Sequence, residues 1–199
     1  MTILVLASVS LGIIFGMFFS GSYIVYNLDF LSQTTLAILL LSVGLDIGSN
    51  KSTLSNIKDK IYSILIVTLS VVFGSLFGGM ATALIFNMQL NEGLAISAGF
   101  GWYSLSGVIL TNIGNAELGS IAFLSNIFRE LITFLIVPIV AVKLNYLSAI
   151  GPAGATAMDT TLPVISNNTD SNTTIVAFVS GVLLTALVPI LVPLLYTII

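Results

Sequence analysis

Two ionisable residues stand next to each other in the middle of a long apolar segment. Residues 117–142 are mostly Leu, Ile, Val, Phe and Ala, and "NIFRE" places Arg129 and Glu130 at the centre. On a helix, Asn126 and Thr133 share one arc of about 100° with this pair. Charges in such a segment normally face a bundle interior or a water-filled cavity. Sequence neighbours on a helix do not face each other, so we expect Arg129 and Glu130 to have separate partners.

The chain offers two further carboxylates in apolar surroundings. Asp159 lies in "GPAGATAMDTTLPVI", where Thr160 and Thr161 add hydroxyl groups. This aspartate is a candidate cation ligand or proton carrier, and the alternative is a helix cap. Asp46 in "SVGLDIG" is a candidate of the same kind, or an interfacial aspartate near Lys51. For Arg129 and Glu130 the alternative to a functional site is a structural role that holds the helices together.

The stretch "GFGWYSLSG", residues 99–107, interrupts another apolar segment with glycines and hydroxyl groups. Irregular backbone at membrane depth is tolerated where protein buries it or where it lines a wet cavity. Trp102 and Tyr103 are therefore expected as pocket walls, where an aromatic face can hold an ammonium group. The alternatives are interfacial anchors for the two rings, and a loop that only fills space. Ser104 and Ser106 complete the candidate site residues of this stretch.

The amino-acid composition indicates the class of protein to which these residues belong. The 199 residues are 57% hydrophobic and only 7% charged, whereas soluble domains carry about 25% charged residues. A polytopic membrane protein in a lipid bilayer is the expectation. The chain has no cysteine and no histidine, so we expect no disulfide, no metal and no cofactor. It has no basic patch for nucleic acid and no nucleophile–base constellation, so we do not expect an enzyme.

The apolar segments predict an all-α protein with about five full transmembrane helices plus two broken or re-entrant segments. The full spans are roughly 3–26, 30–47, 61–86, 117–142 and 173–198. The interrupted segments are 93–114 and 147–165, and the whole chain, 1–199, is expected to form a single transmembrane transport domain. Transporters use such breaks to aim half-helix ends at a substrate near the midplane.

Lysine positions predict how the interrupted segments run. Lys51, Lys58 and Lys60 share one loop, Lys143 follows a later span, and both places should be cytoplasmic. An even number of crossings must then separate residues 60 and 143. The segment 93–114 should accordingly enter from outside and return, and 151–165 should dip in from the cytoplasm. The alternative is that both segments cross fully as discontinuous helices.

The three motifs "GFGWYSLSG", "RE" and "GATAMDTTLP" together resemble the lysine exporter family of bacterial inner-membrane proteins, formerly a domain of unknown function. The resemblance covers nearly the whole chain and implies a multi-pass protein that exports L-lysine and toxic lysine analogues. It implies essential intramembrane acidic residues, of which Glu130 and Asp159 fall within matching motifs and Asp46 does not. Longer family members carry extra spans ahead of this part. We therefore expect a separately encoded small membrane subunit, or assembly of the chain with itself.

The chemistry of the candidate residues suits a basic amino acid. Carboxylates such as Glu130 and Asp159 can pair with ammonium groups, and Arg129 or a half-helix N-terminus can take the substrate carboxylate. Without histidine, secondary transport coupled to protons must run through buried carboxylates. Two alternatives remain: a passive channel for small cations or amino acids with a filter of backbone carbonyls, and a structural subunit of a two-component transporter.

Overall fold

The computed structural model divides the chain into two compact units, residues 1–50 and 51–199. It describes residues 60–198 continuously and, before them, 11–12, 14–18, 27, 34, 38, 41 and 45. In the first unit, 11–12, 14–18, 34, 38, 41 and 45 are helical. Most of the predicted spans 3–26 and 30–47 lies outside the described residues. So do Asp46, Lys51 and Lys58, and their predicted roles stay predictions.

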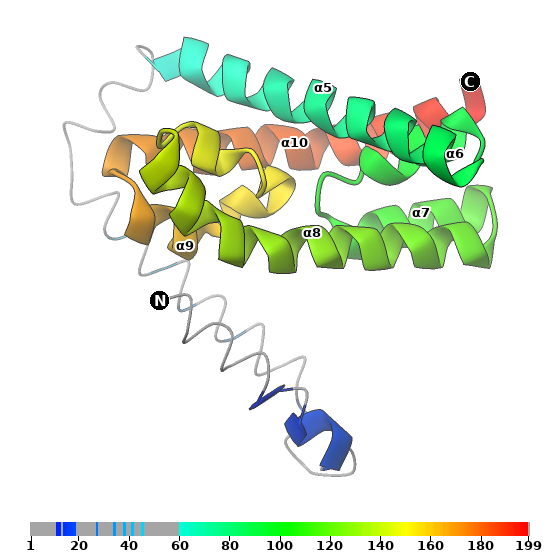
Figure 1. Cartoon of the computed structure of the whole chain (residues 1–199), viewed down its shortest axis with the longest axis horizontal. Coiled ribbons are helices and arrows are strands. Elements are labelled where there is room, and N and C mark those ends of the chain that lie inside the picture. The colour runs from blue at the N-terminus through cyan, green and yellow to red at the C-terminus, as the bar shows by residue number, and fades with distance from the viewer. Residues whose placement is uncertain are drawn as a thin grey trace. The chain divides into compact units, whose positions relative to one another are not determined.

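Three long helices of the second unit run along the bundle in alternating directions (Figure 1). They are α5 (Ile61–Phe86), α8 (Ala116–Lys143) and α10 (Ser171–Ile198). With 26 to 28 residues each, they are about 40 Å long, more than the roughly 30 Å of a hydrocarbon core. Their outer faces expose large apolar side chains, among them Phe73, Phe77 and Phe128. These are the predicted spans 61–86, 117–142 and 173–198, and the all-α membrane fold is confirmed.

The first interrupted segment is a helical hairpin. It consists of α6 (Leu90–Ser97) and α7 (Tyr103–Ile113), which at 8 and 11 residues extend about 12 and 16 Å. The side chain of Asn91, in α6, donates a hydrogen bond to the Tyr196 carbonyl at 3.0 Å. Gly114, just after α7, lies against the Tyr196 hydroxyl. Both ends of the hairpin therefore lie beside one end of α10, so the segment re-enters as predicted (Figure 1).

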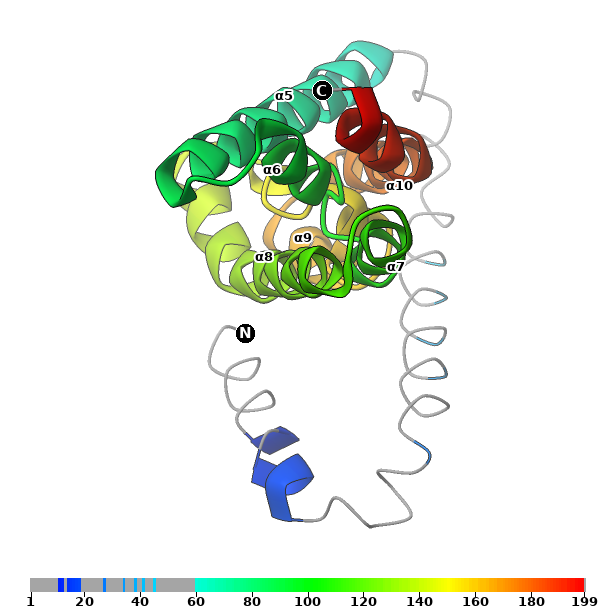
Figure 2. The same ribbon diagram turned by 90° about the vertical axis from the view of Figure 1, so that its right-hand side faces the viewer.

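The second interrupted segment connects α8 to α10. It contains two 3₁₀ turns, η2 (Ser148–Ile150) and η3 (Gly154–Met158), followed by α9 (Leu162–Asn168). Pro163 lies in the first turn of α9, where its missing N–H costs nothing. The segment leaves the C-terminal end of α8 and rejoins the N-terminal end of α10 on the same side (Figure 1). It is re-entrant from the side opposite to the first hairpin. Figure 2 shows α6, α7, α9 and the three long helices gathered in one bundle.

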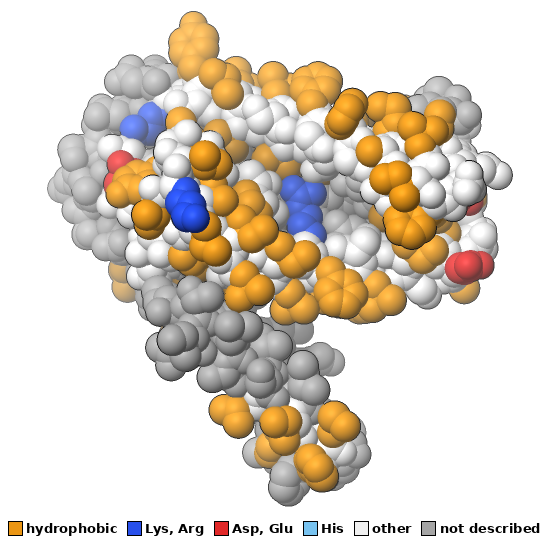
Figure 3. Space-filling view, viewed as in Figure 1, with side chains coloured by type: hydrophobic (Ala, Val, Ile, Leu, Met, Phe, Trp, Pro, Cys, Tyr) orange, Lys and Arg blue, Asp and Glu red, His pale blue; other side chains and the backbone are white. Residues whose placement is uncertain are grey.

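Charged side chains distinguish the two ends of this bundle. Lys60 precedes α5 and Lys143 ends α8, so both lie at the end from which the second segment enters. Glu92 and Glu117 belong to the first turns of α6 and α8, at the opposite end. Asp170, just before α10, also lies at the lysine end, so Figure 3 shows basic and acidic side chains together near that end of the unit and acidic ones at the other. The positive-inside rule assigns the lysine end to the cytoplasm.

The hairpin predicts a labelling pattern for single cysteines, which the chain otherwise lacks. Glu92→Cys and Ala116→Cys should both react with an impermeant thiol reagent added outside intact cells, because both flank the same hairpin. Lys143→Cys should react only after the reagent reaches the cytoplasm. Labelling of Glu92→Cys and Ala116→Cys from opposite sides would show that the segment crosses fully.

Candidate functional site

The tips of the two re-entrant segments meet between the long helices. The carbonyl of Phe100 accepts a hydrogen bond from the backbone N–H of Ala155 at 2.8 Å. Gly154 has a φ of +61°, and a Cβ atom there would collide with the Phe100 carbonyl oxygen. Gly101 has a φ of +102° and packs against Thr156. Gly101 and Gly154, which lie in the two interrupted segments of the sequence, thus permit a backbone contact between the tips.

Asn126 of α8 holds the first tip. Its Oδ1 accepts a hydrogen bond from the Gly101 N–H at 2.7 Å, and its Nδ2 donates to the Ile96 carbonyl at 3.3 Å. The same amide lies 3.4 Å from the Ser106 hydroxyl. Asn126 is 4% exposed and Ser106 is fully buried. These two candidate site residues therefore satisfy the irregular backbone of the tip.

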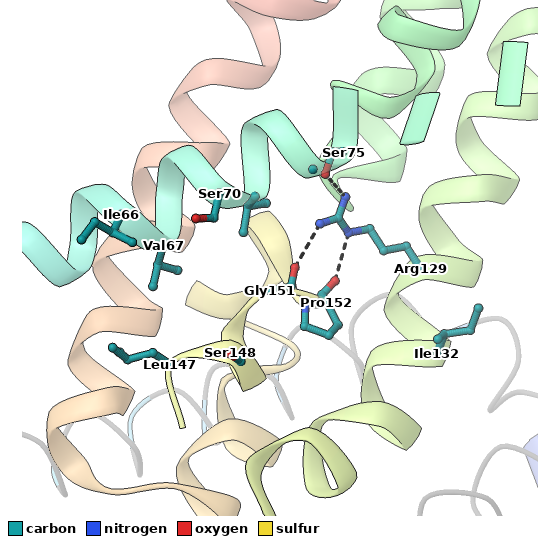
Figure 4. A pocket seen from close by; sticks show the side chains of 12 residues that line it. Ile66, Val67, Ser70, Ser75, Arg129, Ile132, Leu147, Ser148, Gly151 and Pro152 are labelled. Atoms are coloured by element: carbon teal, nitrogen blue, oxygen red, sulfur yellow. Dashed lines mark hydrogen bonds between the residues drawn. The ribbon is translucent and has the colours of Figure 1, made fainter. Parts of the chain in front are cut away.

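Arg129 holds the second tip from the next turn of α8. Its Nε donates to the Pro152 carbonyl at 3.0 Å and its Nη2 to the Gly151 carbonyl at 3.3 Å. Its Nη1 donates to the Ser75 hydroxyl of α5 at 2.8 Å (Figure 4). The guanidinium borders a groove of about 630 Å³ between α5, α8 and η2. Arg129 thus joins α5, α8 and the second re-entrant segment through its planar fork of donors.

Glu130 projects into a different group of side chains. We call Tyr103, Glu130, Asp159 and Thr160 the carboxylate cluster. The Thr160 hydroxyl donates to the Asp159 carboxylate at 3.4 Å, and Glu130, Asp159 and Tyr103 are close enough to interact electrostatically. The carboxylate of Asp159 also accepts the Thr160 N–H at 2.6 Å. The cluster joins the start of α7, the middle of α8 and the turn after η3.

The carboxylate cluster contains no basic partner among residues 60–198. Arg129 directs its donors to Ser75 and the second tip, and the two lysines stand at helix ends. Glu130 and Asp159 are near enough for their charges to interact, and among the described residues Thr160 contributes a hydroxyl group beside them but no cation accompanies them. Two carboxylates that share a half-buried site repel each other unless a proton or a cation lies between them. The arrangement favours a site for a cationic group.

The other candidate residues have separate positions. Thr161 is buried, 3.1 Å from the Thr156 hydroxyl, and supports the second tip. The half-buried Trp102 caps α7, and its carbonyl accepts the Ser106 hydroxyl at 2.9 Å. Ser104 is exposed on α7. Asp46 lies outside the described residues. In the part of the chain that is described, no group of three or more His, Cys, Asp or Glu side chains could hold a metal.

Sequence reasoning missed two residues of this region. Ser75, the α5 partner of Arg129, lies 54 positions before it, and nothing in its sequence context marks it. Phe123 packs its ring edge-on against Tyr103, with centroids 5.4 Å apart. Its position seven residues before Glu130, on the same face of α8, could have signalled it.

Comparison with known proteins identifies the family. The sequence model of the family described as "Lysine exporter LysO" matches residues 6–196. The chain belongs to this family. It is 40% identical over 161 residues to the "Lysine exporter LysO" of Escherichia coli K12, which covers 81% of the chain and 53% of that relative. It is 38% identical over 160 residues to a "Putative lysine exporter" of Haemophilus influenzae, which covers 78% and 79%.

The chain thus spans about half the length of the Escherichia coli relative. No solved structure matches it. Family membership and three apolar helices of membrane length make it a multi-pass protein of the bacterial inner membrane, and the resemblance seen in the sequence is confirmed.

The contact between the tips predicts that alanine at Gly154 and alanine at Gly78 have different effects on stability. Gly154→Ala should lower the free energy of unfolding by about 2–5 kcal/mol, because it adds a left-handed penalty and a clash with the Phe100 carbonyl. Gly78→Ala is the control, since a Cβ on Gly78 meets nothing within 4 Å. Thermal unfolding of purified protein in detergent measures both. Equal stability of the two variants would contradict the contact.

Proposed function

We propose that this chain exports L-lysine from the cytoplasm and that the carboxylate cluster binds an ammonium group of the substrate. The observation that carries this proposal is the proximity of two half-buried carboxylates, Glu130 and Asp159, without a basic partner in the described residues. The names of the relatives, a lysine exporter and a putative lysine exporter, support the same substrate.

The cluster has the chemistry that an ammonium group requires. A lysine ammonium carries three N–H donors and no acceptor. Glu130 and Asp159 supply carboxylate acceptors, whose charge-assisted hydrogen bonds are the strong ones. Thr160 and Tyr103 add hydroxyl oxygens beside them. An ammonium between the two carboxylates also removes their mutual repulsion, so a neutral amino-acid side chain gains none of this stabilisation.

The substrate carboxylate needs a different partner. Three N–H groups of Arg129 donate to Ser75, Gly151 and Pro152, so Arg129 stabilises the fold. The first turn of α7 begins at Tyr103, within the carboxylate cluster. The N-terminus of a helix carries a partial positive charge and free N–H groups. We propose that this turn, beside Trp102, receives the carboxylate of lysine.

We propose that protons and lysine compete for the carboxylate cluster. A proton on Glu130 or Asp159 relieves the same repulsion that the ammonium relieves. With no histidine in the chain, these two half-buried carboxylates are the groups in residues 60–198 that we propose exchange a proton for the substrate. Toxic lysine analogues that keep the side-chain ammonium would follow the same route.

The contacts at the tips favour a carrier over a passive channel. A selectivity filter needs backbone carbonyls that point at the ion. The Phe100, Gly151 and Pro152 carbonyls instead accept hydrogen bonds from Ala155 and Arg129. The tips also meet through the Ala155–Phe100 hydrogen bond. We propose that transport requires a conformational change that parts them, and that a separately encoded small membrane subunit or a second copy provides the spans of longer relatives.

Glu130→Gln tests the role of the cluster. The substitution keeps the side-chain volume but removes the charge, and loss of a buried charge partner costs about 3–5 kcal/mol. Lysine efflux from preloaded vesicles should fall more than about a hundredfold and lose its pH dependence. Glu117→Gln is the control, because Glu117 is exposed in the first turn of the same helix. Efflux by Glu130→Gln at a normal rate and with its usual pH profile would contradict the proposal and favour a purely structural subunit.

Substrate selectivity is tested in cells that lack other exporters. Expression of the chain, with its partner if one is required, should give resistance to a lysine-containing dipeptide. The ammonium requirement predicts no protection against dipeptides that release neutral amino acids. Equal resistance to both kinds of peptide would show that the cluster does not select for positive charge.

A further inference from the structure

A second groove runs along the seam between α7 and α8. It has a volume of about 720 Å³, and its walls include Ser104, Gly107 and Thr111 from α7 and Gly119, Ser120 and Phe123 from α8. Ser104 directly follows Tyr103 of the carboxylate cluster. The far end of the groove reaches Asn112, near the end of the bundle marked by Gly114 and Tyr196. The groove thus extends from the carboxylate cluster toward the end of the bundle that the positive-inside rule places outside the cell.

Polar groups in this groove require water. The hydroxyls of Thr111 and Ser120 bond to carbonyls of their own helices. The Ser104 hydroxyl and the exposed Asn112 amide form no hydrogen bond with the described part of the chain. Several other exposed positions on α8 are large and apolar, for example Ile121, Phe128 and Leu131, and exposed Val108 and Leu124 also line the groove. An unpaired amide is costly in hydrocarbon, which favours water at the Asn112 end of the seam.

An aromatic pair connects the carboxylate cluster with the wall of the groove. Tyr103 belongs to the cluster, Phe123 lines the groove, and their rings meet at 88°. Close approach of the helices makes this contact possible: a Cβ on Gly107 would lie 3.2 Å from the Phe123 Cβ. Such edge-to-face pairs are stable but can open by side-chain rotation. Once parted, both rings offer faces to a passing ammonium group.

We propose that the α7–α8 groove is the outward passage of the exported amino acid and that the Tyr103–Phe123 pair is the gate between this passage and the carboxylate cluster. This inference rests on the proposed function, because it takes the cluster as the substrate site. It assigns Phe123 a positioning role: the ring closes the passage without binding the substrate in the cluster.

The test uses single cysteines and a membrane-impermeant methanethiosulfonate that carries a quaternary ammonium, applied from outside. Ser104→Cys and Thr111→Cys should react, and Phe128→Cys, on the apolar surface of α8, should not. Thr160→Cys reports on the cluster behind the gate. Its reaction rate should rise about tenfold when Phe123→Ala removes the aromatic pair. Phe128→Ala is the matched control and should leave the Thr160→Cys rate unchanged.

Each outcome bears on one part of the inference. Unreactive Ser104→Cys and Thr111→Cys in a chain that still exports lysine would overturn the passage and leave the proposed function intact. If Phe123→Ala leaves the reaction rate of Thr160→Cys unchanged, or if Phe128→Ala raises that rate equally, the aromatic pair is not a gate. If the groove cysteines react and Phe123→Ala raises the Thr160→Cys rate, but the chain does not transport lysine, the passage is supported and lysine is not the substrate.

Discussion

The hydrogen bond between the Ala155 N–H and the Phe100 carbonyl joins two irregular tips in the middle of an apolar bundle. Each peptide group left unpaired in hydrocarbon costs several kcal/mol. The chain can therefore hold two broken segments inside a bilayer only if each tip finds partners in the other tip, in the long helices or in the water of a cavity. Glycines at positions 101 and 154 bring the two backbones close enough for this exchange.

The remaining partners come from one helix, and this explains how the carboxylates are placed. Asn126 and Arg129, one turn apart on α8, bind the first and the second tip respectively. Glu130, the next residue, makes none of these contacts and lies near enough to Asp159 for their charges to interact. The same helix therefore supports both tips and carries one of the two carboxylates. A motion of the second tip relative to α8 would change the distance between Glu130 and Asp159, which offers a physical route from substrate binding to a change of access.

Much of the fold followed from sequence because lipid imposes simple rules. The predicted spans 61–86, 117–142 and 173–198 agree with α5, α8 and α10 to within two residues at each end. Counting crossings between lysines predicted that 93–114 returns to its starting side, and it does. Separate partners for Arg129 and Glu130 were expected from helix geometry and were found.

What sequence could not provide was the pairing between distant segments. Asn126, Arg129, Ser106 and Thr161 were expected near a substrate, yet their hydrogen bonds go to backbone and neighbouring hydroxyls. A polar residue in an apolar segment looks the same whether it supports a tip or contacts a ligand. Only the position of its partner, such as Ser75 on α5 for Arg129, distinguishes the two roles.

The central claim is that the meeting tips make Glu130 and Asp159 into one cation site. A double-mutant cycle in equilibrium lysine binding to the purified protein tests it most directly, with Glu130→Gln, Asp159→Asn and the double variant. If one ammonium lies between both carboxylates, the two losses are strongly coupled, and the double variant binds little more weakly than the worse single variant. Losses that add as for independent sites, or lysine binding that survives both substitutions, would contradict the account.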